Sequence, residues 1–310
     1  MQRTFIFAAV LLLATHESVG QDAPVSEQNK EAFELLKSFY RNEAARYDFS
    51  LDKEGKQKLT LQPPVMTWTG EDYQASHDTV APNSGEVYIW TYEGRAVVAG
   101  GVGSFPLATG RDVFHEFHAF TEQPPQPVPI HLRPTFVWSP QGEKPRPIPD
   151  APRLVSERSA ALTQRLRLTQ MRKLAQEFSG GTIKPDGTGK ARLRLLLTPV
   201  YRLDADELAK GKHNVVDGAV FVFTGEVGTD PEMLLLIECR KTADGLQWTY
   251  VPAAMTYLEM WMEHKDKEVW HIPPFHADQR EHNYITVIVG RYATLDDMKA
   301  TIEPAKTPSK

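Results

Sequence analysis

The chain has little cysteine, little excess charge and only one long apolar run, and each shortage excludes a class of protein. It contains a single cysteine, Cys239, among 310 residues, so no internal disulfide can form and the core alone must hold the fold. Its formal net charge is −5. A generally basic surface is thereby excluded, and nucleic acid is not expected as a partner.

The apolar run lies at the N-terminus, within MQRTFIFAAVLLLATHESVG. Arg3 supplies a positive charge, residues 5–14 are apolar, and small residues precede Gln21. The run is shorter than the roughly 20 residues that span a bilayer. The pattern predicts a cleavable signal peptide over residues 1–20 and no stable membrane span after cleavage. The mature protein is therefore expected in the periplasm or outside the cell. An uncleaved anchor is the alternative.

Several familiar catalytic and binding motifs are also missing. GGVGSFP, residues 100–106, has no third glycine, lysine or following helix, so it is not a nucleotide loop. Its glycines indicate a bulge or a close backbone approach. Asp204, Asp206 and Glu207 lack the spacing of a calcium loop. There is no G-x-S-x-G elbow, and Cys239 lies in an apolar strand pattern typical of a buried thiol. We therefore expect no cofactor and no bound metal.

Prolines divide the chain: ten of the 23 lie in residues 124–152, which we interpret as a connection containing one short strand, TFVW. On either side we predict two α+β halves, residues 21–123 and 153–293, followed by a tail over residues 294–310. Each half begins with an amphipathic helix, residues 27–47 or 157–178. Gly180 and Gly181 suggest a left-handed cap at the end of the second helix.

The strands that follow each helix have matching patterns. GEVYIWT (residues 85–91) resembles GAVFVFT (residues 218–224), and two further strands follow each at turn-like spacings. The predicted fold class is thus α+β, with each half a helix packed on an antiparallel meander, produced by an internal duplication. The alternative is two unrelated α+β halves. NYITVIVGRY, residues 283–292, is long and apolar, which predicts a central strand.

The stretch FHEFHAF, residues 114–120, is the main candidate site. Because a strand alternates its faces, Glu116 and His118 share one face, while His115 and Phe117 share the other. We predict that His115 and Phe117 face the core and that Glu116 and His118 face solvent or a cleft. The spacing is not that of a zinc-binding helix. Two interpretations stay open: a strand with polar side chains, or an acid–base pair formed by Glu116 and His118.

Other histidines and the tryptophans offer weaker candidates. His271, His276 and His282 fall in a proline-rich, charged loop where metal binding is not favoured. His77 and His131 could join a metal site only through the fold. Six tryptophans lie on or beside predicted strands, and several on one open sheet face would make a platform for a sugar ring or an apolar ligand. They are Trp68, Trp90, Trp138, Trp248, Trp261 and Trp270.

Much of the mature chain is similar to one family. The likeness is to a group of exported proteins frequent in planctomycete bacteria. It lies in the order of three segments: the predicted helix QMRKLAQEF, the predicted strand LRLLLTPVYR and the loop GTDPE. The upstream segments WTYEGR and GRDVFHEFHAF fit the same pattern. The resemblance covers about residues 33–274. It implies bacterial export, but no activity comes with it and no functional residue can be transferred.

Together these observations favour an exported protein of the bacterial envelope that is a non-catalytic binding or structural module. Its partner would be a small ligand, a glycan or another envelope protein. The alternative is a hydrolase that uses Glu116 and His118, with or without the assistance of a metal. A site of this kind would bring both side chains together with a third polar group in a pocket, whereas a binding module would have an aromatic cleft without that convergence.

Overall fold

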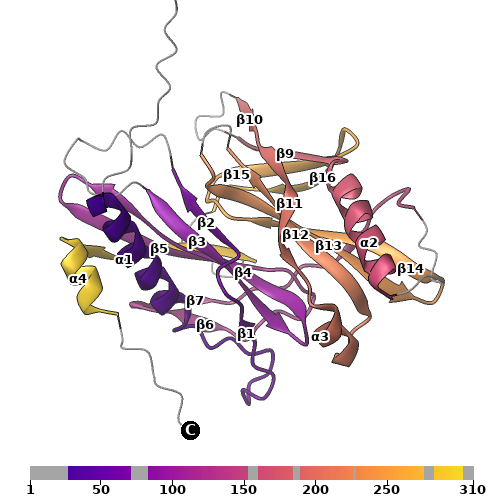
Figure 1. Ribbon diagram of the computed structural model, residues 1–310, viewed down its shortest axis with the longest axis horizontal. Helices are drawn as coiled ribbons and strands as arrows, with labels where there is room; N and C mark the ends of the chain where they lie inside the picture. Colours follow the sequence, from indigo (N-terminus) through magenta and orange to yellow (C-terminus); the bar gives the residue numbers. More distant parts are fainter. Residues whose placement is uncertain are drawn as a thin grey trace, which may run out of the picture.

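The computed structural model describes residues 27–70, 83–152, 160–183, 189–225, 228–275 and 283–302. Within these ranges the chain is built mainly from antiparallel strands, with seventeen strands and four helices, two of them only six residues long. Figure 1 shows two large sheets, one mainly magenta and one mainly orange, side by side. The protein is therefore β-rich.

The first sheet has the order β1-β3-β4-β5-β17, and β2 also pairs with β3. Every pair in it is antiparallel. Its strands are β1 (Thr60–Leu61), β2 (Met66–Thr69), β3 (Ser84–Tyr92), β4 (Arg95–Leu107), β5 (Gly110–Ala119) and β17 (Tyr284–Tyr292).

The second large sheet has the order β11-β12-β13-β14-β8, again with antiparallel pairing throughout. Its strands are β11 (Arg194–Arg202), β12 (Val215–Thr224), β13 (Pro231–Thr242), β14 (Gly245–Ala254) and β8 (Arg146–Pro147). Two smaller sheets complete the strands. One has the order β10-β9-β15-β16 and the other pairs β6 with β7. These strands are β6 (Val128–Ile130), β7 (Arg133–Trp138), β9 (Phe178–Ile183), β10 (Lys190–Arg192), β15 (Glu259–His264) and β16 (Lys267–Ile272).

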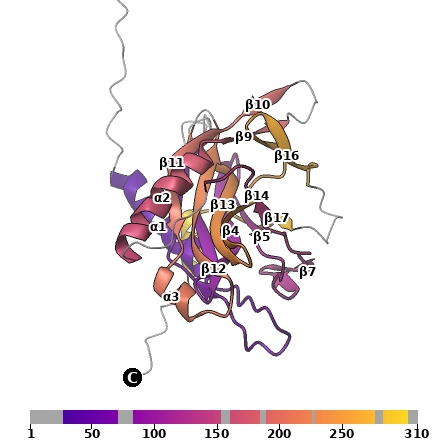
Figure 2. The same cartoon turned by 90° about the vertical axis from the view of Figure 1, so that its right-hand side faces the viewer.

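The two large sheets pack on one another through buried apolar side chains. Val87 and Ile89 of β3 belong to the same cluster as Val222 of β12 and Leu234 and Leu236 of β13. Burial of this kind supplies about 25 cal/mol for each Å² of apolar surface removed from water, and it is the main force joining the sheets. Figure 2, turned by 90°, shows β4, β5 and β12–β14 layered together in the middle of the molecule.

Helices cover the outer faces of both large sheets. Helix α1 (Glu27–Ala44) packs Leu36 and Phe39 against the first sheet, together with β6 and β7. Helix α2 (Ala160–Ala175) packs Met171 and Leu174 against the second sheet. Helix α3 (Ala205–Lys210) contacts β12, and α4 (Leu295–Ala300) contacts α1 and β17. None of the helices in the described part of the chain has the length and apolarity to cross a bilayer.

The predicted α+β class, with two helix-on-meander halves, is wrong. The meanders β3-β4-β5 and β12-β13-β14 do form, but they are parts of larger sheets that draw strands from both predicted halves and from the connection. Strand β17, which falls in the predicted second half, pairs with β5, and β8 from the proline-rich stretch pairs with β14. The strand order that the meanders share does not establish a duplication.

Two further corrections concern local patterns. Gly180 and Gly181 do not cap a helix: they lie in β9, where a Cβ on Gly181 would stand 2.7 Å from the Trp261 ring. Strand β17 is not central but ends the first sheet. Its apolar residues are still explained, because Ile285, Val287 and Val289 pack in the core beneath α1 and α4. The predicted signal peptide, residues 1–20, and residues 303–310 lie outside the described residues.

Candidate functional site

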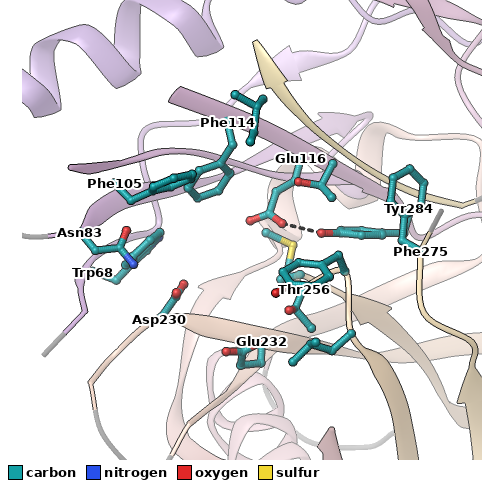
Figure 3. Close-up of a pocket in the computed structure, with 15 residues that line it drawn as sticks. Trp68, Asn83, Phe105, Phe114, Glu116, Asp230, Glu232, Thr256, Phe275 and Tyr284 are labelled. Atoms are coloured by element: carbon teal, nitrogen blue, oxygen red, sulfur yellow. Dashed lines mark hydrogen bonds between the residues drawn. The ribbon is translucent and has the colours of Figure 1, made fainter. Parts of the chain in front are cut away.

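A cavity of about 580 Å³ lies between the first sheet and the beginning of β13, where the chain following β14 closes it. Six of its fifteen lining residues are aromatic, and Figure 3 shows several of their rings around the cavity. They are Trp68, Phe105, Phe114, Tyr257, Phe275 and Tyr284. Three carboxyl groups, those of Glu116, Asp230 and Glu232, also line it. The cavity is therefore apolar and aromatic but acidic.

Glu116 is held by its neighbours in the first sheet. The Tyr284 hydroxyl, from β17, donates a hydrogen bond of 2.8 Å to Glu116 Oε2. Gly101 on β4 makes room for the other oxygen, because a Cβ at that position would lie 2.5 Å from Oε1. Among the described residues Oε1 has no hydrogen-bond partner, and Figure 3 shows the carboxyl group pointing into the cavity. The side chain is thus anchored at one oxygen and available at the other.

The environment of Glu116 favours its neutral form. The residue is only 5% exposed. Burial raises its pKa well above the usual range, and repulsion from Asp230 and Glu232 raises it further, while the Tyr284 hydrogen bond acts in the opposite direction. At neutral pH we therefore expect a protonated carboxyl group facing an apolar space.

Asp230 and Glu232 stand on the wall opposite Glu116 in Figure 3. Asp230 precedes β13 and Glu232 lies at its start. Burial raises the pKa of Asp230 well above its usual range, with a further contribution from Glu232. Burial also raises the pKa of Glu232, against the effect of a hydrogen bond from the Thr256 side chain. Both residues are partly exposed, so solvent moderates these effects more than at Glu116.

No cationic side chain lines this cavity among the residues that the structure describes. The described ranges also contain no group of three histidine, cysteine or acidic residues placed to hold a metal ion. Burial raises the pKa values of these carboxyl groups, and no arginine in the described lining offsets that effect.

His118 does not join Glu116. It is 1% exposed, and its Nδ1 accepts a hydrogen bond of 3.1 Å from the Ala254 backbone N–H. The ring of Tyr284 stands beside it, with centroids 6.3 Å apart, and His118 borders a different hollow from the one that Glu116 lines. Desolvation lowers the pKa of His118 to about 3. Alternation predicted the shared face, and each side chain lines a hollow, but the two hollows are separate and His118 is almost completely buried.

His115 and Phe117 face the core, as predicted. His115 is fully buried, and its Nδ1 lies 2.6 Å from the Tyr47 hydroxyl. Desolvation lowers its pKa to about 3, with a smaller effect from His131. Glu43 Oε2 approaches both histidines, 3.7 Å from His115 Nε2 and 2.9 Å from His131 Nδ1. This group lies beneath α1, on the side of β5 opposite the cavity.

The remaining candidates have structural roles. His271 is exposed and 2.8 Å from Glu259 Oε1, whereas His77, His276 and His282 lie outside the described residues. Asp204 accepts hydrogen bonds from the backbone N–H groups of Asp206 and Glu207, and thereby caps α3. Burial raises the pKa of Cys239 to about 12, consistent with an inert thiol.

The glycines of residues 100–106 have the close approaches that the sequence indicated. A Cβ on Gly100, Gly101 or Gly103 would lie within 2.6 Å of Phe117, Glu116 or Phe114 respectively. The tryptophan platform is not formed: all six indoles are at most 7% exposed, and only Trp68 lines the cavity.

Sequence reasoning missed Asp230, Glu232 and Tyr284. A signal did exist in TDPEM, where two acidic residues flank a proline at the entrance of the apolar strand β13. An acidic residue that enters a buried strand needs a partner or a cavity. Tyr284 gave no such signal, because its contact with Glu116 joins positions 168 residues apart.

Comparisons with known proteins add no identity to this geometry. No protein-family model matches the chain, and no curated protein or solved structure matches it. The site must be interpreted from its own residues.

Proposed function

We propose that the protein is a non-catalytic binding module of the bacterial envelope, exported through residues 1–20, which takes a small and largely apolar ligand into the cavity between the sheets. One observation carries the proposal: an aromatic cavity holds a buried carboxyl group, that of Glu116, which is anchored at one oxygen and open at the other.

The size and lining of the cavity support this function. Ligand pockets generally have volumes of about 300–1,000 Å³, with apolar walls and a few placed polar groups. The cavity, at about 580 Å³, has this composition. Its walls come largely from sheet strands, and Gly101 and Tyr284 fix the position of Glu116, so the site is organised before a ligand arrives.

The same geometry favours binding over hydrolysis. Hydrolysis by paired carboxyl groups needs one protonated and one ionised partner, hence environments that push their pKa values apart. Here the pKa values of all three carboxyl groups are raised. His118 cannot supply the base, because it lines a different hollow and hydrogen-bonds to the backbone.

A ligand screen with a blocked variant tests the proposal. Ile288 lines the cavity and is 47% exposed, so Ile288→Trp would obstruct the cavity without disturbing the core. Leu197→Trp, at a residue of 48% exposure on β11, is the matched control. We expect a set of small aromatic molecules, detected by saturation-transfer NMR, to bind the wild type and Leu197→Trp but not Ile288→Trp. No binding, or equal binding to Ile288→Trp, would refute the function.

Export has its own test. N-terminal sequencing of protein recovered from the envelope fraction should give a chain that begins at or near Gln21. An intact Met1 in that fraction would refute cleavage, although the binding function would stand.

A further inference from the structure

We infer that the cavity binds an organic cation, an amine or quaternary ammonium group on an apolar body. This inference rests on the proposed function and names its class of ligand. It follows from three features: buried acidic groups without a cation, aromatic walls, and the open oxygen of Glu116.

The protein pairs other buried carboxylates with arginine. Glu86 is bound by Arg41 through contacts of 3.1 and 3.3 Å. Glu238 is bound by Arg95 at 2.7 and 3.2 Å. The three cavity carboxyl groups have no such partner among the described residues. A cationic ligand would supply the missing charge, and it would find acidic groups on both walls.

The aromatic walls suit the same ligand. A cation is attracted to the face of an aromatic ring within about 6 Å of its centre, and aromatic side chains are a common lining for quaternary ammonium groups. Trp68 and Phe114 stand together, with centroids 6.3 Å apart, on the side of the cavity that faces Asp230 in Figure 3. Gly85 makes room for the indole of Trp68, since a Cβ there would lie 2.6 Å from the ring. An anionic ligand, in contrast, would meet three acidic groups.

Binding of a cation should release a proton. Glu116 is neutral in the empty cavity for the reasons given above, and a permanent positive charge near Oε1 would favour its ionised form. The titratable groups facing it are Tyr284 from β17, and Asp230 and Glu232 from the start of β13, and β4 presents only Gly101. Tyr257 is the other titratable residue of the lining. One of the carboxyl groups must therefore supply the proton.

A pair of probes of equal shape tests the inference. Benzyldimethyl(2-hydroxyethyl)ammonium carries a quaternary nitrogen, and 3,3-dimethyl-4-phenylbutan-1-ol has carbon in its place. Calorimetry at pH 7.5 should show the ammonium compound binding at least tenfold more tightly. Titrations in two buffers of different ionisation enthalpy should show release of about one proton per cation bound. Because the quaternary nitrogen has no proton to lose, that proton must come from the protein.

A variant assigns the effect to the cavity. Glu116→Gln should weaken binding of the ammonium compound at least tenfold and leave binding of the alcohol unchanged. Glu207→Gln, at an exposed site on α3, controls for general charge attraction and should change neither. Equal or tighter binding of the alcohol would overturn the cation inference while the binding function stands. If neither probe binds, both fall. Tight cation binding that Glu116→Gln does not alter would overturn the role of the cavity carboxyl groups.

Discussion

The protein buries carboxyl groups in two kinds of surroundings. Glu238, on β13, is fully buried, forms a two-contact pair with Arg95 from β4, and lies 3.3 Å from Arg240 Nε. Glu116, on β5, is almost as deeply buried but faces a cavity and receives one hydrogen bond, from a neutral phenol. The first is a charged group that helps to join the two large sheets. The second is a group that the fold keeps neutral.

The difference separates a structural charge from a recognition group. A buried ion pair contributes little net free energy, but breaking it is costly because the remaining charge stays in the interior. A neutral carboxyl group beside a cavity has the opposite property. Its replacement should change the free energy of unfolding little, whereas it should contribute strongly to the free energy of ligand binding. Four changes test this contrast, beginning with the largest expected effect.

Glu238→Gln should be the most damaging change. It removes the carboxylate that Arg95 and Arg240 share in a largely buried site, and we expect the free energy of unfolding to fall by about 3–5 kcal/mol. Urea unfolding monitored by tryptophan fluorescence measures this. The control is Glu207→Gln, which removes an exposed pair with Lys210 and should change stability by less than about 0.5 kcal/mol. Comparable effects of the two variants would contradict the structural role of Glu238.

His118→Ala should lower stability by about 2 kcal/mol at pH 7.5, because it opens a void and leaves the Ala254 N–H without an acceptor. At acidic pH the difference in unfolding free energy between the wild type and His118→Ala should disappear. The pKa of His118 is about 3 in the fold and near 6.5 in the unfolded chain, so the unfolded state binds more protons between these values. Stability of the wild type therefore falls as the pH drops below 6.5, by about 2 kcal/mol at pH 5 for this histidine.

Urea unfolding of both proteins at pH 7.5 and pH 5 checks that sign. Effects of the other titrating groups largely cancel between variant and wild type. His271→Ala, at an exposed histidine, should show no comparable change with pH. A deficit in His118→Ala that grows toward pH 5 would mean that His118 is charged in the fold.

Glu116→Gln should act in the opposite direction and raise stability at neutral pH. Because the folded pKa of Glu116 is raised, the folded state binds more protons than the unfolded state above the unfolded pKa of about 4.5. Its contribution to stability is complete below that pH and is lost as the pH rises. Glutamine does not titrate, so the variant should equal the wild type at pH 4 and be more stable than the wild type at pH 7.5, with the gap widening as the pH rises. A loss of stability like that of Glu238→Gln would break the comparison.

Tyr284→Phe should have the smallest effect on stability, about 1 kcal/mol or less, since it removes the hydroxyl that donates to Glu116 and leaves the ring in place. It sharpens the comparison, because that hydrogen bond is the one interaction that lowers the pKa of Glu116. Binding of the ammonium probe should weaken, as its carboxyl partner becomes harder to ionise. Tyr257→Phe, at a residue 59% exposed, is the control for calorimetry and urea unfolding. Unchanged affinity in Tyr284→Phe would contradict the coupling.

Local patterns predicted individual elements better than their assembly. The two meanders, the short strand at β7 and both long helices followed from periodicity and turn residues. The fold class did not, because the pairing of β17 with β5 and of β8 with β14 is set by packing far along the chain. Strand β9 of the sheet β10-β9-β15-β16 was missed for a local reason. Its sequence, FSGGTI, resembles the end of a helix, whereas Gly181 leaves room for the Trp261 ring on the neighbouring strand.

For the site, alternation gave the correct faces of β5 but not their surroundings. It placed Glu116 and His118 on one side and His115 and Phe117 on the other, as observed. Whether a face meets solvent, a cavity or a second sheet depends on what covers it, and that information lies in the rest of the chain. Asp230, just before β13, and Tyr284, on β17, define the surroundings of Glu116, and both are remote from it in sequence.

The pairing of β17 with β5 has a kinetic consequence. The first sheet cannot be completed until residues 284–292 have been synthesised and have reached a strand made long before them. Contacts between such distant positions slow folding, because the entropy of closing a long loop is lost before the contact forms. During that interval β5 presents a free edge, the feature by which nascent β-proteins associate with one another. The last strand to arrive therefore both supplies part of the cavity wall and ends the period in which the chain is prone to aggregate.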